Sequence, residues 1–254
     1  EAVHKQYESS DRDPVPVIKG ISFTVNRGDS IAIVGPSGSG KSTLLQALSM
    51  QVKAQRGSVS YDMRETGLTD LGGLSSARMR LLARTDWGFV HQNPRDGLRL
   101  DITAGGNIGE RLMMVGERHY AHIRHEAEDW MSRVELDLGR IDAVPRTFSG
   151  GMQQRLQIAR NLVSGPRLLF MDEPTGGLDV SVQARLLDLL RELVREIDVA
   201  VIIVTHDLAV ARLLSDRLMV MRGGKVVESG LTDQVLDDPR HAYSQLLVSS
   251  ILQV

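Results

Sequence analysis

The pattern of apolar and polar residues along the chain predicts strands that alternate with helices. Residues 21–35 read as alternating and then continuous apolar strands, broken by a turn at Asn26, Arg27 and Gly28. Two further apolar runs, LLFMD at 168–172 and VAVIIVTH at 199–206, are typical of buried strands. Because segments with helical spacing separate these strands, we expect an α/β fold with a parallel sheet.

Helical spacing is visible in three places. It begins after Lys41 in the run STLLQALSM, it recurs around residues 121–135, and it is clearest at Val182, Leu186, Leu189, Leu193 and Ile197. From about residue 62 to 147 the chain is polar, rich in Arg and punctuated by Gly, with no strong strand after FVHQ. We interpret this stretch as an inserted, mostly helical lobe.

Composition narrows the class of protein. The chain has 254 residues, of which 42% are hydrophobic and 24% charged, so it can bury a substantial core. A net charge of −2 argues against a basic nucleic-acid-binding face. The absence of cysteine excludes disulfides and thiolate metal sites, and fits a cytoplasmic protein. The longest apolar stretch is too short to span a bilayer, and no signal peptide opens the chain, so we expect no direct membrane insertion.

A phosphate-binding loop is predicted by the sequence GPSGSGKS at residues 35–42, which fits the pattern G-x-x-x-x-G-K-[ST] between a strand and a helix. Its bare backbone N–H groups and the following helix N-terminus favour phosphate oxygens. Lys41 is expected to reach the β- and γ-phosphates, and the Ser42 hydroxyl to bind Mg²⁺. The predicted nucleotide-contacting residues are Gly35, Ser37, Gly38, Ser39, Gly40, Lys41, Ser42 and Thr43.

The segment LLFMDEP at residues 168–174 carries two carboxylates directly after four apolar residues, which places them at the edge of the sheet where parallel α/β folds bind ligands. Asp172 is expected to hold Mg²⁺ through water. Glu173, one residue further, is expected to be the base that orients or deprotonates the attacking water. Together with the phosphate loop, these carboxylates predict a nucleotide hydrolase.

A second anion site is predicted in FSGGMQQR, residues 148–155, where a serine and two glycines begin a helix. The inserted lobe separates Ser149, Gly150 and Gly151 from Lys41 along the chain. We therefore expect two copies to face head to tail, each lending this segment to the phosphate loop of the other, so that the dimer encloses two nucleotides.

With these motifs in this order, nearly the whole chain resembles an ABC-type ATPase, in which the segment around Ser149 is the signature motif. The resemblance implies an α/β P-loop NTPase fold with a RecA-like parallel sheet core, an antiparallel β subdomain and an inserted α-helical lobe. As one domain, it would place the nucleotide-binding core at residues 1–92 and 155–254, and the lobe at 93–154.

The same resemblance implies roles for four more residues. Gln92, in FVHQNP, would contact Mg²⁺ and water and report the nucleotide state to a partner. His206, in IIVTHD, would contact the γ-phosphate, and Asp179, in TGGLD, would cross the dimer interface. Tyr7, in HKQY, would stack on adenine, although an aromatic side chain at this position also suits packing against the first hairpin.

Other residues that attract attention have simpler interpretations. His119, His122 and His125 recur every three residues, but this spacing drifts around a helix and favours a solvated surface over a metal site. Trp87 and Trp130 are expected to pack inside the lobe rather than to stack on bases.

Within the family, HQNPRDGLRLDITAGGNIGERLM and the block from TFSGGMQQR to LDLLREL resemble the ATP-binding subunit of the bacterial carbon–phosphorus lyase complex, which degrades phosphonates. The implied partner is a soluble lyase core, which hydrolysis of ATP would remodel. The alternative is the ATP subunit of a dipeptide, oligopeptide or phosphonate importer, because TGGLDVSVQA and the C-terminal DDPRHAYSQLLVSSIL suit it equally. DNA-repair and ribosome-associated relatives are disfavoured, since the chain has no coiled-coil insertion and no basic surplus.

Overall fold

The computed structural model describes residues 2–9 and 12–250, with side chains described for residues 2–5 and from 16 onward. The chain divides into two compact units. One consists of Glu1–Met79 together with Ile202–Val254, and the other of Arg80–Val201. In the part of the chain that the structure describes, no helix has the length and apolar character needed to cross a membrane.

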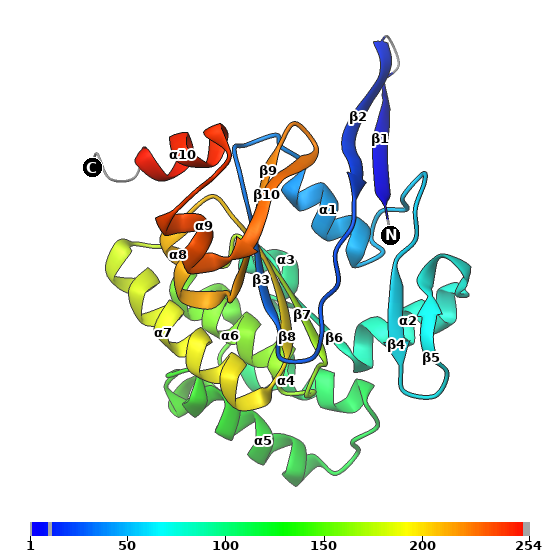
Figure 1. Ribbon diagram of the computed structural model, residues 1–254. Helices are drawn as coiled ribbons and strands as arrows, with labels where there is room; N and C mark the ends of the chain where they lie inside the picture. Colours follow the sequence, from blue (N-terminus) through cyan, green and yellow to red (C-terminus); the bar gives the residue numbers. More distant parts are fainter. Residues whose placement is uncertain (1, 10–11, 251–254) are drawn as a thin grey trace. The chain divides into compact units, whose positions relative to one another are not determined.

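The first unit begins with antiparallel hairpins (Figure 1). Strands β1 (Val3–Ser9) and β2 (Arg12–Ile21) pair with each other, and β4 (Ser60–Met63) pairs with β5 (Gly67–Asp70). A bridge between His4 and Arg56 connects the first hairpin to the segment that leads into β4. The short helix η1 (Leu71–Gly73) follows, and α2 (Ser76–Thr85) then runs into the second unit.

The central strands of the first unit are buried along their whole length. All five residues of β3 (Ser30–Val34) are buried, as are all six of β8 (Ala200–Thr205), which starts in the second unit and continues into the first. β3 runs parallel to β9 (Arg217–Arg222), and β10 (Lys225–Leu231) pairs with β9 in the antiparallel direction. The expected parallel pairing is present between β3 and β9, and β10 adds an antiparallel edge strand, so this part of the sheet is mixed.

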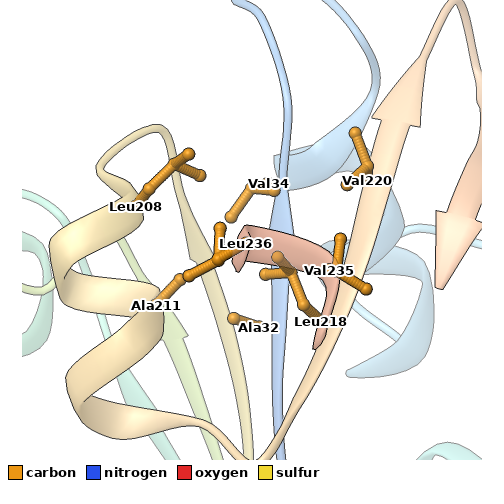
Figure 2. Close-up of a cluster of buried hydrophobic side chains, with 8 residues drawn as sticks. All are labelled: Ala32, Val34, Leu208, Ala211, Leu218, Val220, Val235 and Leu236. Atoms are coloured by element: carbon orange, nitrogen blue, oxygen red, sulfur yellow. The ribbon is translucent and has the colours of Figure 1, made fainter. Parts of the chain in front are cut away.

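A hydrophobic cluster anchors the strand that leads into the phosphate loop. Figure 2 shows side chains from β3 and β9 meeting those from α8 (Leu208–Leu214) and α9 (Thr232–Asp237). Helix α10 (Ala242–Ser249) adds three partly buried side chains to this core. The cluster consists of Ala32, Val34, Leu208, Ala211, Leu218, Val220, Val235 and Leu236. Burial of these residues fixes the direction in which β3 delivers the chain to residue 35.

The second unit combines a pair of parallel strands with helices. β6 (Trp87–Val90) pairs with β7 (Leu168–Asp172). The helices are α3 (Pro94–Gly97), α4 (Ala104–Met114), α5 (Tyr120–Arg133), η2 (Leu138–Arg140), η3 (Pro145–Thr147), α6 (Gly150–Leu162) and α7 (Val180–Ile197). The ring centroids of Trp87 and Phe170 lie 5.4 Å apart between the two strands.

The elements predicted from apolar runs and helical spacing are largely present. Residues 168–172 form β7, residues 200–205 form β8, and the helix expected around 121–135 spans 120–133. The stretch 22–25 is not a strand. No further residue of β1 pairs with this stretch, because Val3 at the start of β1 already pairs with Ile21 at the end of β2. The hairpin formed by β4 and β5 also overlaps the stretch from about residue 62 to 147 that we expected to be mostly helical.

Candidate functional site

The phosphate loop connects β3 to α1 (Lys41–Leu48) and depends on glycine at defined positions. Gly35, Gly38 and Gly40 have φ angles of 152°, 76° and 100°. A Cβ on Gly35 would lie 2.2 Å from the Met221 carbonyl oxygen, and one on Gly40 would lie 2.7 Å from that of Val17. Since backbone cannot yield as a flexible side chain can, the loop has this path only when both positions lack a side chain.

Polar groups inside the loop suit an anionic ligand. Lys41 is buried, and its Nζ donates hydrogen bonds to the carbonyl oxygens of Gly35 at 2.9 Å and Pro36 at 3.1 Å. The Ser39 hydroxyl is buried and has no hydrogen-bond partner among the described residues. A buried ammonium, an unsatisfied buried hydroxyl and a cradle that a Cβ would fill together fit a phosphate chain.

The remaining predicted residues of the loop lie at its surface or at the start of α1. Ser37 and Gly38 are exposed at the tip of the loop, Ser42 is exposed in the first turn of α1, and Thr43 is half-buried. Gly40, the N-cap residue of α1, has a left-handed conformation. The helix therefore starts directly at Lys41, and the N–H groups of its first turn lie next to the loop.

His206 occupies the turn between β8 and α8, within the first unit. The Asp207 carboxylate accepts hydrogen bonds from the N–H groups of Ala209 at 2.8 Å and Val210 at 3.4 Å, and so caps α8. The Asp207 N–H in turn donates to the Thr205 hydroxyl at 3.0 Å. Both neighbours of His206 are thus fixed, and its side chain is exposed.

In the second unit, β7 ends at the two predicted carboxylates. Asp172 and Glu173 are both half-buried. Glu173 has φ of +47°, the left-handed conformation that few non-glycine residues adopt. The turn that it begins is closed by a hydrogen bond from the Gly176 N–H to the Glu173 carbonyl oxygen at 2.9 Å. Such backbone outliers persist where the surroundings enforce them, and they are frequent at functional sites.

Gln92 lies against this turn. A Cβ on Gly176 would come within 3.2 Å of the Gln92 Cγ, so the glycine leaves room for the glutamine side chain to pass over the turn that follows Glu173. The structure thus brings together two residues that are far apart in the sequence, the predicted base and the predicted sensor.

The signature segment begins α6 as the sequence indicates. The Ser149 hydroxyl accepts a hydrogen bond from the Met152 N–H at 3.4 Å and caps the helix. Gly150 and Gly151 form the first turn, and a Cβ on Gly151 would lie 2.8 Å from the Val182 Cγ1. Since Val182 belongs to the first turn of α7, the bare start of α6 lies beside the start of α7.

Asp179, the predicted interface residue, is the N-cap of α7. Its carboxylate makes no capping hydrogen bond, and both Asp179 and the following Val180 are exposed. Val180 is 84% exposed, an unusual value for a large apolar side chain. Tyr7 belongs to β1 by its backbone, but its side chain lies outside the described residues.

One titratable group near Gln92 has a shifted pKa. Burial lowers the pKa of the preceding His91, and the negative charge of Asp96 only partly opposes the shift. The imidazole therefore favours its neutral form, and it packs with its centroid 4.5 Å from that of Phe89. His119, His122 and His125 are exposed as expected, and no metal-binding group of three or more His, Cys, Asp or Glu residues occurs within the described ranges.

The sequence interpretation missed the residues that hold these segments together. The side chains of Gln154 and Gln157 bond the backbone on either side of the site, at Pro174 and at His91. Their signal was a pair of amides three residues apart on a helix that otherwise carries core residues.

Comparison with known proteins agrees with this geometry. Residues 18–176 match the family model described as ABC transporter. The chain is 63% identical over 233 residues to a phosphonates utilization ATP-binding protein, PhnK, of Escherichia coli (strain K12), covering 92% of this chain and 90% of that protein. It is 35% identical to the oligopeptide transport ATP-binding protein OppD of Bacillus subtilis (strain 168), covering 93% of this chain and 67% of that protein.

Solved structures share the fold. The ATP-binding cassette MJ0796, in a dimeric post-hydrolysis state bound to ADP and Pi, aligns with a TM-score of 0.81 at 29% identity over 91% of this chain and 97% of that chain. The cbiO1 protein of Clostridium perfringens, part of the ABC transporter complex cbiONQ, aligns with a TM-score of 0.78 at 26% identity over 100% of this chain and 97% of that chain. The family match, the relatives and the phosphate loop lead to one conclusion: the chain belongs to the ABC family and is an ATP-binding, ATP-hydrolysing cassette.

Proposed function

We propose that the chain is the ATP-hydrolysing subunit of a soluble carbon–phosphorus lyase complex that breaks down phosphonates, and that it works in the cytoplasm, where ATP is supplied. The observation that carries this proposal is the 63% identity to PhnK along nearly the full length of both chains. The peptide-transport relatives OppD and DppD are only 35% and 36% identical. An importer subunit remains the alternative function.

In this proposal the first unit binds the triphosphate. The backbone of residues 35–43 surrounds the phosphates, Lys41 neutralises the β- and γ-phosphate oxygens, and Tyr7 stacks on the adenine. His206 contacts the γ-phosphate from the turn after β8.

The second unit supplies the hydrolytic groups. A water oxygen attacks the γ-phosphorus, the bond to the β-phosphate oxygen breaks, and Glu173 accepts the proton of the attacking water. Mg²⁺, when bound, would neutralise negative charge on the phosphate oxygens. Its ligands would be the Ser42 hydroxyl, the Gln92 side-chain oxygen and, through water, Asp172, a set of oxygen donors of the kind that Mg²⁺ prefers.

The active assembly is a dimer in which Ser149, Gly150 and Gly151 of one copy contact the γ-phosphate held by the other. Asp179 crosses the interface beside them. We assign residues 93–154 to the lobe that faces the lyase core and residues 1–92 and 155–254 to the nucleotide-binding core. Hydrolysis removes the phosphate that links the two copies, and the dimer then opens.

A mixing experiment tests the shared site. Lys41→Ala and Ser149→Glu should each abolish turnover in a pure preparation. A heterodimer of the two variants contains one doubly defective site and one intact site. An equimolar mixture should therefore recover roughly a quarter of the wild-type rate if partners exchange freely and the sites act independently. A mixture that stays inactive would show that the signature segment does not act across the dimer.

Affinity purification tests the partner. Glu173→Gln should retain ATP binding and trap the closed dimer, so the tagged variant is expected to capture soluble lyase subunits in the presence of ATP. Lys41→Ala, which weakens ATP binding, serves as the matched control and should capture less. Recovery of membrane permeases in place of soluble lyase subunits would replace the proposal with the importer alternative.

A further inference from the structure

Helix α6 carries a stripe of buried amides behind the signature segment. Gln154, Gln157 and Asn161 follow one another at intervals of three and four residues, a spacing that places them on one face of the helix. Their exposed fractions are 2%, 0% and 7%. Since buried polar side chains are almost always hydrogen-bonded, the partners of these amides define what the face holds.

The stripe binds the side of β6 that does not pair with β7. The Asn161 Oδ1 accepts a hydrogen bond from the Phe89 N–H at 2.9 Å. Two residues along, the Gln157 Oε1 accepts from the His91 N–H at 2.7 Å, and its Nε2 donates to the His91 carbonyl oxygen at 3.2 Å. Side chains of α6 thus take the place of a neighbouring strand, up to the residue that precedes Gln92.

A second branch of the network reaches the turn that follows Glu173. The Gln157 Nε2 also donates to the Gln154 Oε1 at 3.2 Å, and the Gln154 Nε2 donates to the Pro174 carbonyl oxygen at 2.8 Å. Two side-chain amides therefore connect His91 to Pro174. These are the backbone neighbours of Gln92 and Glu173.

The surrounding backbone leaves no spare room for Gln157. A Cβ on Gly97, the last residue of α3, would lie 2.3 Å from the Gln157 Oε1 and 2.8 Å from its Cδ. The φ of Gly97 is not in the left-handed region, so glycine is required there by the close approach and not by the backbone conformation. An alanine at position 97 can be accommodated only if the Gln157 amide moves away from His91.

We propose that Gln157, acting through Gln154, is a positioning residue for ATP hydrolysis. It holds the segment of Gln92 and the turn of Glu173 in a fixed relation to the helix that begins at Ser149. Glutamine suits this position because one neutral amide both accepts from the His91 N–H and donates to the His91 carbonyl. The role rests on the proposed shared site, since α6 presents its glycine-rich start to the other copy.

The test compares Gln157→Met, which keeps the volume and removes the amide, with Gln245→Met. Gln245, in α10, also donates its Nε2 to a backbone carbonyl, that of Pro239 at 3.0 Å, but it is exposed and in the first unit. With the full-length protein, kcat per folded chain should fall between about tenfold and a hundredfold for Gln157→Met, while KM for ATP changes less than about twofold. Gln245→Met should leave both unchanged.

A purely structural role predicts a different result: a lower thermal midpoint and a smaller folded fraction, with normal kcat per folded chain. That outcome would overturn the proposal. Gly97→Ala provides a second variant, which retains the glutamine at position 157 but displaces its side-chain amide. It should lower kcat in the same manner, and the double variant should be no slower than Gln157→Met alone, because both changes break one contact. If Gln157→Met does not fold, a normal kcat per folded chain in Gly97→Ala overturns the proposal in its place.

The mixing experiment separates failure of this inference from failure of the proposed function. If Lys41→Ala and Ser149→Glu do not restore each other, the shared dimer site is wrong. If they restore each other but Gln157→Met retains the wild-type kcat, the dimer stands and the positioning role is wrong.

Discussion

The phosphate loop and the segment around Gln92 are both held rigidly, but by opposite means. The path of the loop depends on the absence of side chains, because Gly35 and Gly40 lack the Cβ that would collide with backbone oxygens. The segment that leads to Gln92 depends instead on added side chains, because Gln157 and Asn161 accept hydrogen bonds from its backbone N–H groups in place of a neighbouring strand. A site for phosphate needs bare N–H groups. The segment before Gln92 is instead held by side-chain amides that pair with its backbone.

The two regions should respond differently to single substitutions. A backbone collision cannot relax without moving a strand, so one substitution in the loop is severe. A side-chain hydrogen bond can be lost while the fold survives. One substitution at an amide should therefore cause a partial loss of stability, or a small shift of the backbone segment that the amide holds.

The largest effect should come from the phosphate loop, where two glycines form a matched pair. Gly40→Ala places a Cβ 2.7 Å from the Val17 carbonyl oxygen, whereas a Cβ on Gly38 meets nothing within 4 Å. Both residues have positive φ. Gly40→Ala should reduce the free energy of unfolding by about 3 kcal/mol or more. Gly38→Ala should cost about 1–2 kcal/mol, from the backbone conformation alone.

Urea unfolding of the two variants measures this difference directly. Equal losses would show that positive φ, and not the close approach of backbone, decides the need for glycine. The support assigned to the phosphate loop would then be wrong.

The next effect should appear at a fully buried amide of the second unit. Asn107, in α4, accepts from the Arg99 N–H at 2.9 Å and donates to the carbonyl oxygens of Arg99 and Ile102, each at 2.9 Å. Asn107→Leu removes these bonds and leaves the Arg99 N–H and the Ile102 carbonyl oxygen without their side-chain partner, so it should lower the free energy of unfolding by about 2–4 kcal/mol. Asn26→Leu removes an exposed amide and should change it by less than about 0.5 kcal/mol. Thermal or urea unfolding of both variants checks the contrast.

Sequence alone was sufficient for the loop because residue type and spacing there determine the geometry. The run SIAIV predicts a buried strand, GPSGSGKS predicts the turn and Lys41 predicts the start of the helix; all three are present. The run LLFMD likewise placed Asp172 and Glu173 at the end of a strand. Short-range sequence patterns are sufficient where residues that are neighbours in the sequence determine the local structure.

The remainder could not be predicted because it depends on contacts between distant segments. Gln157 reads as a polar surface position until the edge of β6 is placed beside it, 66 residues away in sequence. The hairpin of β4 and β5 was missed because its residues are all exposed or half-buried, so that no apolar run marks it. The antiparallel pairing of β10 was missed because the residues of that strand are exposed or half-buried as well.

A smaller effect is expected at an ion pair in the second unit. Arg160 donates to the Glu110 carboxylate at 2.7 Å and also to the Asn107 carbonyl oxygen, and both charged side chains are largely buried. Arg160→Met should lower the free energy of unfolding by about 1.5–2 kcal/mol. The control is Arg124→Met, which removes more exposed ion pairs with Asp142 and Glu128 and should lower the free energy of unfolding by less than about 1 kcal/mol. Similar losses in both variants would contradict a role for burial.

The smallest effect is a pH dependence localised to His91. Burial lowers the pKa of this imidazole below 6.5, so the unfolded chain binds a proton that the folded chain resists. Stability should therefore be complete above pH 6.5 and should decline modestly as the pH falls toward 5. Carboxylates such as Glu117, whose pKa is lowered by backbone hydrogen bonds from His119 and Arg118, lose their contribution only at lower pH, below about 4.5. His91→Gln should flatten urea-unfolding midpoints between pH 7 and 5. An unchanged slope in this variant would assign the decline in stability to another group.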